Sequence, residues 1–125
     1  MTNAPETSRK ERLLAHLAMH IGSECVFRHW SRRLVYTEGV QCLAQEAKAY
    51  WLIDLIASYV PHPKMYGQAF VVWKLTVNPN RTALAVADDG NGKELLRQEI
   101  AFTDFPLDEI THYLTDRTLL LTSEY

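Results

Sequence analysis

The stretch that decides the fold runs through residues 69–102 and reads AFVVWKLTV, NPNR, TALAVA, DDGNG and KELLRQEIAF. Three apolar-rich runs, 69–77, 82–87 and 94–102, alternate with short segments rich in Asn, Asp, Gly and Pro, which favour tight turns. In the first run the large apolar residues fall on alternate positions. The stretch therefore predicts three consecutive antiparallel strands, with one covered face and one face at least partly in water.

Two helices are predicted before this meander. Residues 8–21 carry apolar side chains at helical spacing between Ser8 and Gly22, which predicts a capped amphipathic helix. Residues 38–59 follow Thr37, a helix-capping residue type, and Pro61 stops the run. The second half of this run, AYWLIDLIASY at residues 49–59, is apolar almost all round. We expect one long helix whose second half is buried on several sides.

A further helix is predicted near the C-terminal end. Pro106 suits a first helical turn, and the spacing of Leu107, Ile110 and Leu114 gives one buried stripe. Short β-prone runs lie at residues 24–30, 34–36 and 119–122. The expected fold class is α+β: an antiparallel meander sheet with one long hydrophobic helix packed on a face, plus an N-terminal and a C-terminal helix. We expect a single domain over residues 1–125, with an N-terminal helix within 1–23 and an α+β core at 24–125.

Composition excludes several classes of protein. The 125 residues are 47% hydrophobic and 22% charged, which is typical of one domain with a core. No apolar stretch approaches the roughly 20 residues of a membrane-spanning helix, and the polar N-terminus does not resemble a secretory signal. We therefore expect a cytoplasmic protein without membrane contact. The net charge of −2 combines a mildly basic part at residues 1–50 with an acidic part at 51–125.

The segment RHWSRR at residues 28–33 mixes guanidinium groups with aromatic rings. Such mixtures bind phosphates and stack on bases. The candidate partner-binding or phosphate-binding residues are Arg28, His29, Trp30, Arg32, Arg33 and Tyr36. Because the patch is short and the whole chain is acidic, a solvated or internally paired strand end is the alternative.

Asp54 lies in the most hydrophobic stretch of the chain and is a candidate buried acid. An inward-facing carboxylate there needs a partner to hold its charge. It would serve as a general acid or base with His29 or His112, or as a structural acceptor paired with Arg32 or Arg33.

No metal or cofactor is expected. His16 and His20 have the helical spacing of two zinc ligands, but no third ligand accompanies them. The DGNG segment at residues 89–92 lacks the spacing of a calcium or phosphate loop and predicts a hairpin turn. Cys25 and Cys42 form no C-x-x-C pair and are expected to be reduced thiols.

Several segments together resemble a known family. They are LVYTEGV at 34–40, AYWLID at 49–54, the W-x-L-T-V core at 73–77, FTDFPL at 102–107 and LTSEY at 121–125. Residues 24–125 resemble a family of small proteins of unknown function from bacterial genomes, plasmids and phages. The resemblance implies no activity and no catalytic residues. The setting of the family on mobile elements implies a phage or plasmid role, including interference with a host defence complex.

The leading functional hypothesis is a non-catalytic binding protein that engages a protein or nucleoprotein partner through an acidic face or a sheet edge. One alternative is a nucleic-acid-binding or phosphate-binding accessory protein that uses Arg28, Arg32 and Arg33. The other is a small hydrolase centred on Asp54. The sequence leaves the oligomeric state open.

Overall fold

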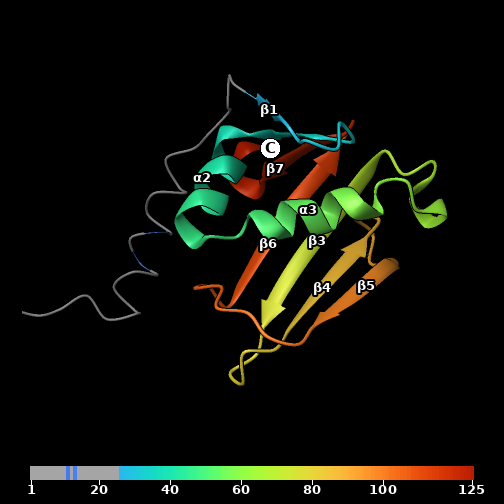
Figure 1. Ribbon diagram of the computed structural model, residues 1–125. Coiled ribbons are helices and arrows are strands. Elements are labelled where there is room, and N and C mark those ends of the chain that lie inside the picture. The colour runs from blue at the N-terminus through green and yellow to red at the C-terminus, as the bar shows by residue number, and fades with distance from the viewer. Residues whose placement is uncertain (1–10, 12, 14–25) are drawn as a thin grey trace, which may run out of the picture.

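The computed structural model describes residues 11, 13 and 26–125, and these residues form one seven-stranded sheet with two short α-helices (Figure 1). The strand order is β1-β2-β7-β6-β3-β4-β5. Every neighbouring pair is antiparallel except β2 and β7, which run parallel. The strands are β1 Val26–Arg28, β2 Val35–Thr37, β3 Phe70–Val77, β4 Ala83–Asp88, β5 Glu94–Ile100, β6 Glu109–Thr115 and β7 Thr118–Leu121.

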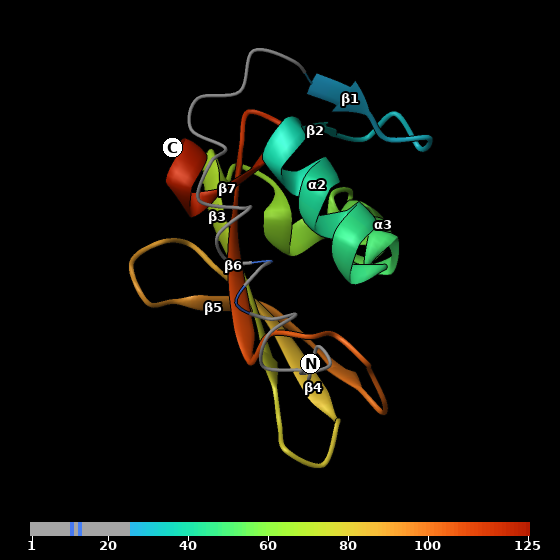
Figure 2. The same ribbon diagram turned by 90° about the vertical axis from the view of Figure 1, so that its left-hand side faces the viewer.

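The helices α2 (Glu38–Ala47) and α3 (Tyr50–Tyr59) lie on the same side of the sheet, as Figure 2 shows. Two 3₁₀ turns complete the described elements, η1 at Pro63–Met65 and η2 at Thr122–Glu124. The hydrophobic core joins the buried side chains of both helices to those of the central strands. None of the helices formed by the described residues has the length and hydropathy needed to cross a bilayer.

Strands β3, β4 and β5 form the predicted meander. Trp73 pairs with Ala87 and Leu75 with Ala85, so large side chains on β3 lie beside alanines on β4. The alternating burial along β3 and β4 marks one covered face. Tyr59 of α3 reaches this face, where its hydroxyl contacts the Gln98 side-chain oxygen and its ring lies 5.7 Å from that of Trp73.

The fold-class prediction is wrong at the C-terminal helix. Residues 101–108 form a loop, and β6 takes the place of the helix, between β3 and β7. Ile110 and Leu114 satisfy strand spacing as well as helical spacing, and the β-branched residues around them favour a strand. Arg81 fixes the preceding loop by donating to the carbonyl oxygens of Thr103 at 3.0 Å and Phe105 at 2.6 Å.

The prediction of one long helix is also wrong. The run breaks at Lys48, whose backbone is left-handed with φ 54°, and α3 begins two residues later. The amide groups of Lys48 and Ala49 both donate to the carbonyl oxygen of Ala44, which closes α2. Both residue types are good helix formers, so tertiary packing rather than local propensity sets this break. The result is a mainly β fold with a mixed sheet, in place of an antiparallel sheet crossed by one long helix.

A carboxylate near the C-terminus ties η2 to the start of α2. The Glu124 side chain accepts hydrogen bonds from the Thr37 hydroxyl at 2.6 Å and from the Gly39 amide at 3.1 Å. It also accepts from the Leu121 amide at 2.9 Å. Thr37 in turn caps α2 by accepting from the Val40 amide. The YTEGV and LTSEY segments noted in the sequence are therefore in direct contact.

The predicted N-terminal helix lies outside the described residues apart from Glu11 and Leu13, of which Leu13 is buried. His16, His20 and Cys25 also lie outside them.

Candidate functional site

The arginine-aromatic segment is divided between the two faces of the β1–β2 hairpin. Arg28 pairs with Val35, and Phe27 pairs with Tyr36, so these two pairs point to opposite faces. Arg28, Arg32 and Arg33 line a hollow, whereas Trp30 and Tyr36 lie toward α3. The six candidate residues therefore form two sites rather than one.

On the α3 side, Asp54 is a partner of the hairpin turn. Its Oδ1 accepts hydrogen bonds from His29 Nε2 at 2.7 Å and from Trp30 Nε1 at 3.1 Å. Its side chain is 51% exposed, so the expectation of a buried acid is not met. The break at Lys48 places Leu52, Ile53, Ile56 and Ala57 on the buried stripe of α3, which leaves Asp54 on the exposed side.

His29 connects Asp54 to the turn between β1 and β2. The ring is buried, and its Nδ1 lies 2.7 Å from Ser31 Oγ and accepts from the Ser31 amide at 3.1 Å. The Nδ1 atom acts as an acceptor here, so Nε2 carries the proton donated to Asp54. The Ser31 oxygen accepts from the Arg33 amide at 3.2 Å. These contacts fix the backbone of the turn that carries Arg32 and Arg33.

At a second histidine, too, Nδ1 accepts a hydrogen bond from the amide two residues later in the chain. His62 Nδ1 accepts from the Lys64 amide at 3.1 Å in η1. An amide two residues after a histidine, bonded to Nδ1, is thus a turn-capping device in this fold. We therefore assign His29, together with Asp54 and Ser31, the role of holding the turn that carries Arg32 and Arg33 in place.

Tyr36 belongs to the α3 side of the hairpin. Its ring stacks on Phe27 with the centroids 5.7 Å apart. Burial raises the pKa of the Tyr36 hydroxyl, and the nearby Tyr50 and Asp54 raise it further. Tyr36 is therefore a neutral packing residue at neutral pH.

On the opposite face, four arginines surround a hollow of about 290 Å³. Three belong to the predicted segment, and Arg117 joins them from the turn between β6 and β7. The two turns are held together because the Val35 amide donates to the Arg117 carbonyl oxygen at 2.9 Å. The side chains that line the hollow are Arg28, Arg32, Arg33, Leu34, Val35, Asp116 and Arg117.

Among the described residues, no side chain forms an ion pair with the arginines of this hollow. All four arginines are exposed, and none of their guanidinium groups makes a hydrogen bond or ion pair with the residues that the structure describes. Of the described residues that line the hollow, Asp116 is the one acidic residue. Unpaired guanidinium groups around a concave surface bind carboxylates and phosphates.

The backbone at the β6–β7 turn is unusual for its residue types. Asp116 and Arg117 form a two-residue turn with φ 51° and 59°. Asn-Gly or Asp-Gly is the preferred pair for such a turn, because a β-carbon is disfavoured at positive φ. An arginine at the second position contributes a guanidinium group to the hollow at a cost in backbone energy.

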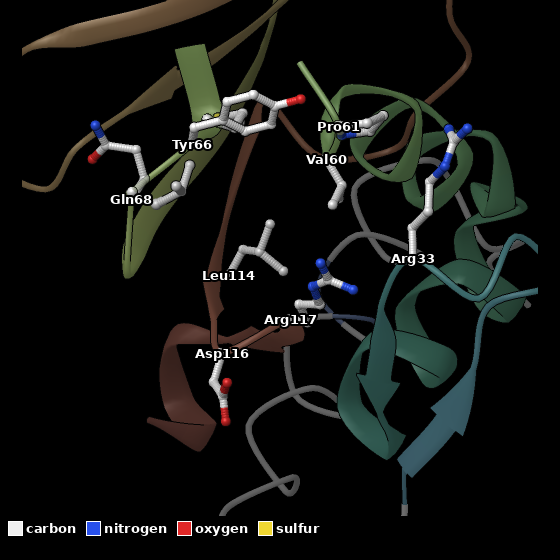
Figure 3. A pocket seen from close by; sticks show the side chains of 11 residues that line it. Arg33, Val60, Pro61, Tyr66, Gln68, Leu114, Asp116 and Arg117 are labelled. Atoms are coloured by element: carbon white, nitrogen blue, oxygen red, sulfur yellow. The ribbon is translucent and has the colours of Figure 1, made fainter. Parts of the chain in front are cut away.

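A second and larger pocket of about 450 Å³ adjoins the hollow. Arg33, Asp116 and Arg117 line both. Its other walls come from the end of α3, the η1 loop and the central strands, as Figure 3 shows. Those residues are Val60, Pro61, Met65, Tyr66, Gly67, Gln68, Val71 and Leu114.

Sequence reasoning located three of the four arginines but missed Arg117, Tyr66 and Gln68. Arg117 follows the segment that was expected to be helical, so its turn was not recognised. The signal was an Asp-Arg pair between two β-prone runs, 109–115 and 118–121. Tyr66 and Gln68 lie in a loop whose position depends on tertiary packing, and no local pattern marks them.

The fold and this arginine-lined surface define a small, mainly β protein with two short helices on a mixed sheet and a concave cationic site at one end of the β1–β2 hairpin. A family of unknown function, DUF6876, matches residues 11–125, and the chain belongs to this family. The match begins within the segment that the sequence resemblance left out. No curated protein and no solved structure was found to match the chain.

Proposed function

We propose that this protein is a non-catalytic binding protein of a bacterial or mobile-element system, and that it binds single-stranded nucleic acid, free or within a nucleoprotein complex. The observation that carries the proposal is the cluster of Arg28, Arg32, Arg33 and Arg117 around one hollow, without internal partners among the described residues. Each guanidinium group can contact a backbone phosphate. An inhibitor of a host nucleoprotein complex would act through the same surface.

Exposed aromatic rings support a single-stranded ligand. Tyr66 lines the pocket that adjoins the hollow and is 70% exposed. Trp30 is 80% exposed but lies on the α3 side of the hairpin, so Tyr66 is the ring within reach of a ligand in the hollow. Bases that are not paired stack on such rings, whereas paired bases are inaccessible to them.

The acidic part of the chain offers a weaker surface for a partner. Glu94 is paired with Arg97 at 2.7 Å, and Glu109 is paired with Lys74 at 3.3 Å. These pairs partly neutralise the carboxylates of the exposed sheet face. The arginine hollow carries unpaired charge, which favours a polyanion over a basic partner.

A salt titration tests the proposal. Fluorescence anisotropy of a labelled single-stranded oligonucleotide gives the binding constant at several salt concentrations. Removing two phosphate contacts should reduce the slope of log K against log salt by about 1.4, at roughly 0.7 per contact. We expect this change, with weaker binding, for the double variant Arg32→Ala/Arg33→Ala.

The control is Arg97→Ala, which removes one positive charge from β5 at the other end of the strand order, compared with two in the double variant. It should bind as the unmodified protein does. Absence of oligonucleotide binding at low salt, or an equal loss in Arg97→Ala and in the double variant, would refute the arginine hollow as the binding surface.

A second candidate function, hydrolysis, is favoured by one observation. His29 bridges Asp54 and Ser31, each at 2.7 Å, and this is the order of a nucleophile, a base and an orienting acid. Neither the hollow nor the adjoining pocket is lined by Ser31, so the candidate ranks second. Covalent labelling of Ser31 by a fluorophosphonate, lost in Asp54→Ala, would support it, and an unlabelled Ser31 would exclude it.

A further inference from the structure

We infer that the 450 Å³ pocket receives one nucleotide, with its phosphate on Arg33 and Arg117 and its base on the ring of Tyr66. The inference rests on the proposed function and names the ligand of that surface more closely. The same combination of a phosphate and a base is found in a free nucleoside monophosphate and in one nucleotide of a strand.

The pocket has two chemically different ends. Figure 3 shows Arg33 and Arg117 on one side of the pocket, with their guanidinium groups turned away from each other, and Tyr66 and Gln68 on the other side, with Leu114 between them. A ligand that fills this pocket needs an anionic group at one end and a flat, partly apolar body at the other. A nucleotide has this division, and a volume of about 450 Å³ lies within the usual range for small-ligand sites.

The floor of the pocket is apolar and preformed. Met65 and Val71 are buried, and Leu114 packs against the core. The η1 loop is tied by two backbone hydrogen bonds, from the Tyr66 amide to Pro63 and from the Gln68 amide to Met65, each at 3.2 Å. The ring of Tyr66 is therefore presented by an ordered turn, which lowers the entropy lost when a base stacks on it.

Polar groups around the pocket are available to a ligand. The Tyr66 hydroxyl and the side-chain amide of Gln68 make no hydrogen bonds to the residues that the structure describes. A glutamine side chain offers both donors and an acceptor, as recognition of a base edge requires. A single exposed tyrosine is ordinary on a protein surface, but here it shares a pocket with two unpaired guanidinium groups.

The charge at the other end suits one phosphate. The Asp116 carboxylate points away from the guanidinium group of Arg117 in Figure 3, so it does not occupy the anion position. The Arg33 side chain is exposed and can turn toward Arg117 when a ligand binds, and two guanidinium groups then balance the charge of one phosphate monoester. The neighbouring hollow, with Arg28 and Arg32, then provides contacts for the next phosphate of a strand.

The test is competition against the labelled oligonucleotide by nucleoside monophosphates, by the same nucleosides without phosphate, and by inorganic phosphate. We expect monophosphates to compete, and nucleosides and phosphate to compete far more weakly. Stronger competition by a 5′-phosphorylated oligonucleotide than by its unphosphorylated form would identify a strand end. Equal competition by the two forms, with monophosphates still active, would identify an internal nucleotide. Direct binding of a labelled monophosphate, with no binding of the labelled oligonucleotide, would identify a free nucleotide.

Variants of Tyr66 separate stacking from charge. Tyr66→Ala should weaken binding of monophosphates by roughly 5- to 150-fold, the range of one base stack, and Tyr66→Phe should restore it. The matched control is Phe102→Ala, which removes an equally exposed ring from another loop. Thermal unfolding verifies that each variant is folded.

The outcomes distinguish the two proposals. If the oligonucleotide binds through the arginines but monophosphates do not compete and Tyr66→Ala has no effect, the nucleotide pocket is overturned and the proposed function stands. If neither the oligonucleotide nor any monophosphate binds, both are overturned.

Discussion

Gly39 lies against Glu124 so closely that a β-carbon at Gly39 would be 2.7 Å from the carboxylate. The same carboxylate accepts hydrogen bonds from the Gly39 amide and the Thr37 hydroxyl. This contact joins two segments that are 85 residues apart in the chain. It also explains why a glycine stands in the first turn of α2, where most other residue types favour a helix more.

Gly39→Ala should therefore destabilise the protein by about 2 kcal/mol, because the added methyl group displaces Glu124 from charged hydrogen bonds. Urea unfolding followed by circular dichroism measures the loss. In the double variant Gly39→Ala/Glu124→Ala, the combined loss should be smaller than the sum of the single losses, since both remove the same contact. Additive losses would show that the two residues act independently.

We expect Arg117 to lower the stability of the protein and to strengthen its binding of the oligonucleotide. Arg117→Gly removes the strain of a side chain at φ 59° and should stabilise the protein by about 1 kcal/mol. The same change removes one phosphate contact and should weaken binding of the oligonucleotide. Arg117→Ala is the matched control, because it loses the contact and keeps the β-carbon. Equal stability of the Gly and Ala variants would contradict the strain argument.

Asp54 should affect binding only through the hairpin turn. Asp54→Ala removes the acceptor of both His29 and Trp30, and we expect a loss of about 1 kcal/mol in stability with faster amide exchange at residues 31–33. Binding of the oligonucleotide should weaken modestly. Ser58→Ala, on the exposed side of the same helix, is the control. Unchanged exchange in Asp54→Ala would remove the positioning role.

His112 makes stability depend on pH. Burial lowers its pKa to about 4, and the charge of Glu124 offsets this only in part. The unfolded state therefore binds more protons between pH 6.5 and 4, so stability is complete above about pH 6.5 and falls as the pH drops toward 4. The loss contributed by this group is about 3 kcal/mol. In His112→Leu, the free energy of unfolding measured with urea should depend less on pH between 6.5 and 4. An unchanged dependence on pH would show that other groups cause the loss of stability.

The sequence was informative where local and tertiary preferences agree. The meander was predictable because strand alternation on β3 and turn residues such as Gly90 point to the same structure. The strand β6 was not, because Ile110 and Leu114 fit a helix and a strand equally well, and its place between β3 and β7 depends on partners far along the chain. The break at Lys48 likewise has no local signal.

The candidate site was predictable to a similar degree. The arginines of residues 28–33 were identified by composition, but a linear cluster does not show which side chains share a face. The alternation of β1 and β2 separates Arg28 from Tyr36, and the parallel pairing of β2 with β7 brings in Arg117. Asp54 is exposed rather than buried because the helix break sets the rotation of α3.

The parallel pairing of β2 with β7 also sets the order in which the protein can be assembled. β2 is followed by residues 38–117 before β7 is made, and among the described strands β1 and β7 are its only ladder partners. The two turns that form the cationic hollow therefore meet only after both helices, the meander and β6 have been synthesised. A chain without β7 would carry three of the four arginines on a hairpin that contacts Asp54 of α3 but lacks a strand on the other edge of β2. The hollow lined by the four arginines is thus completed only when β7 has been synthesised and has paired with β2.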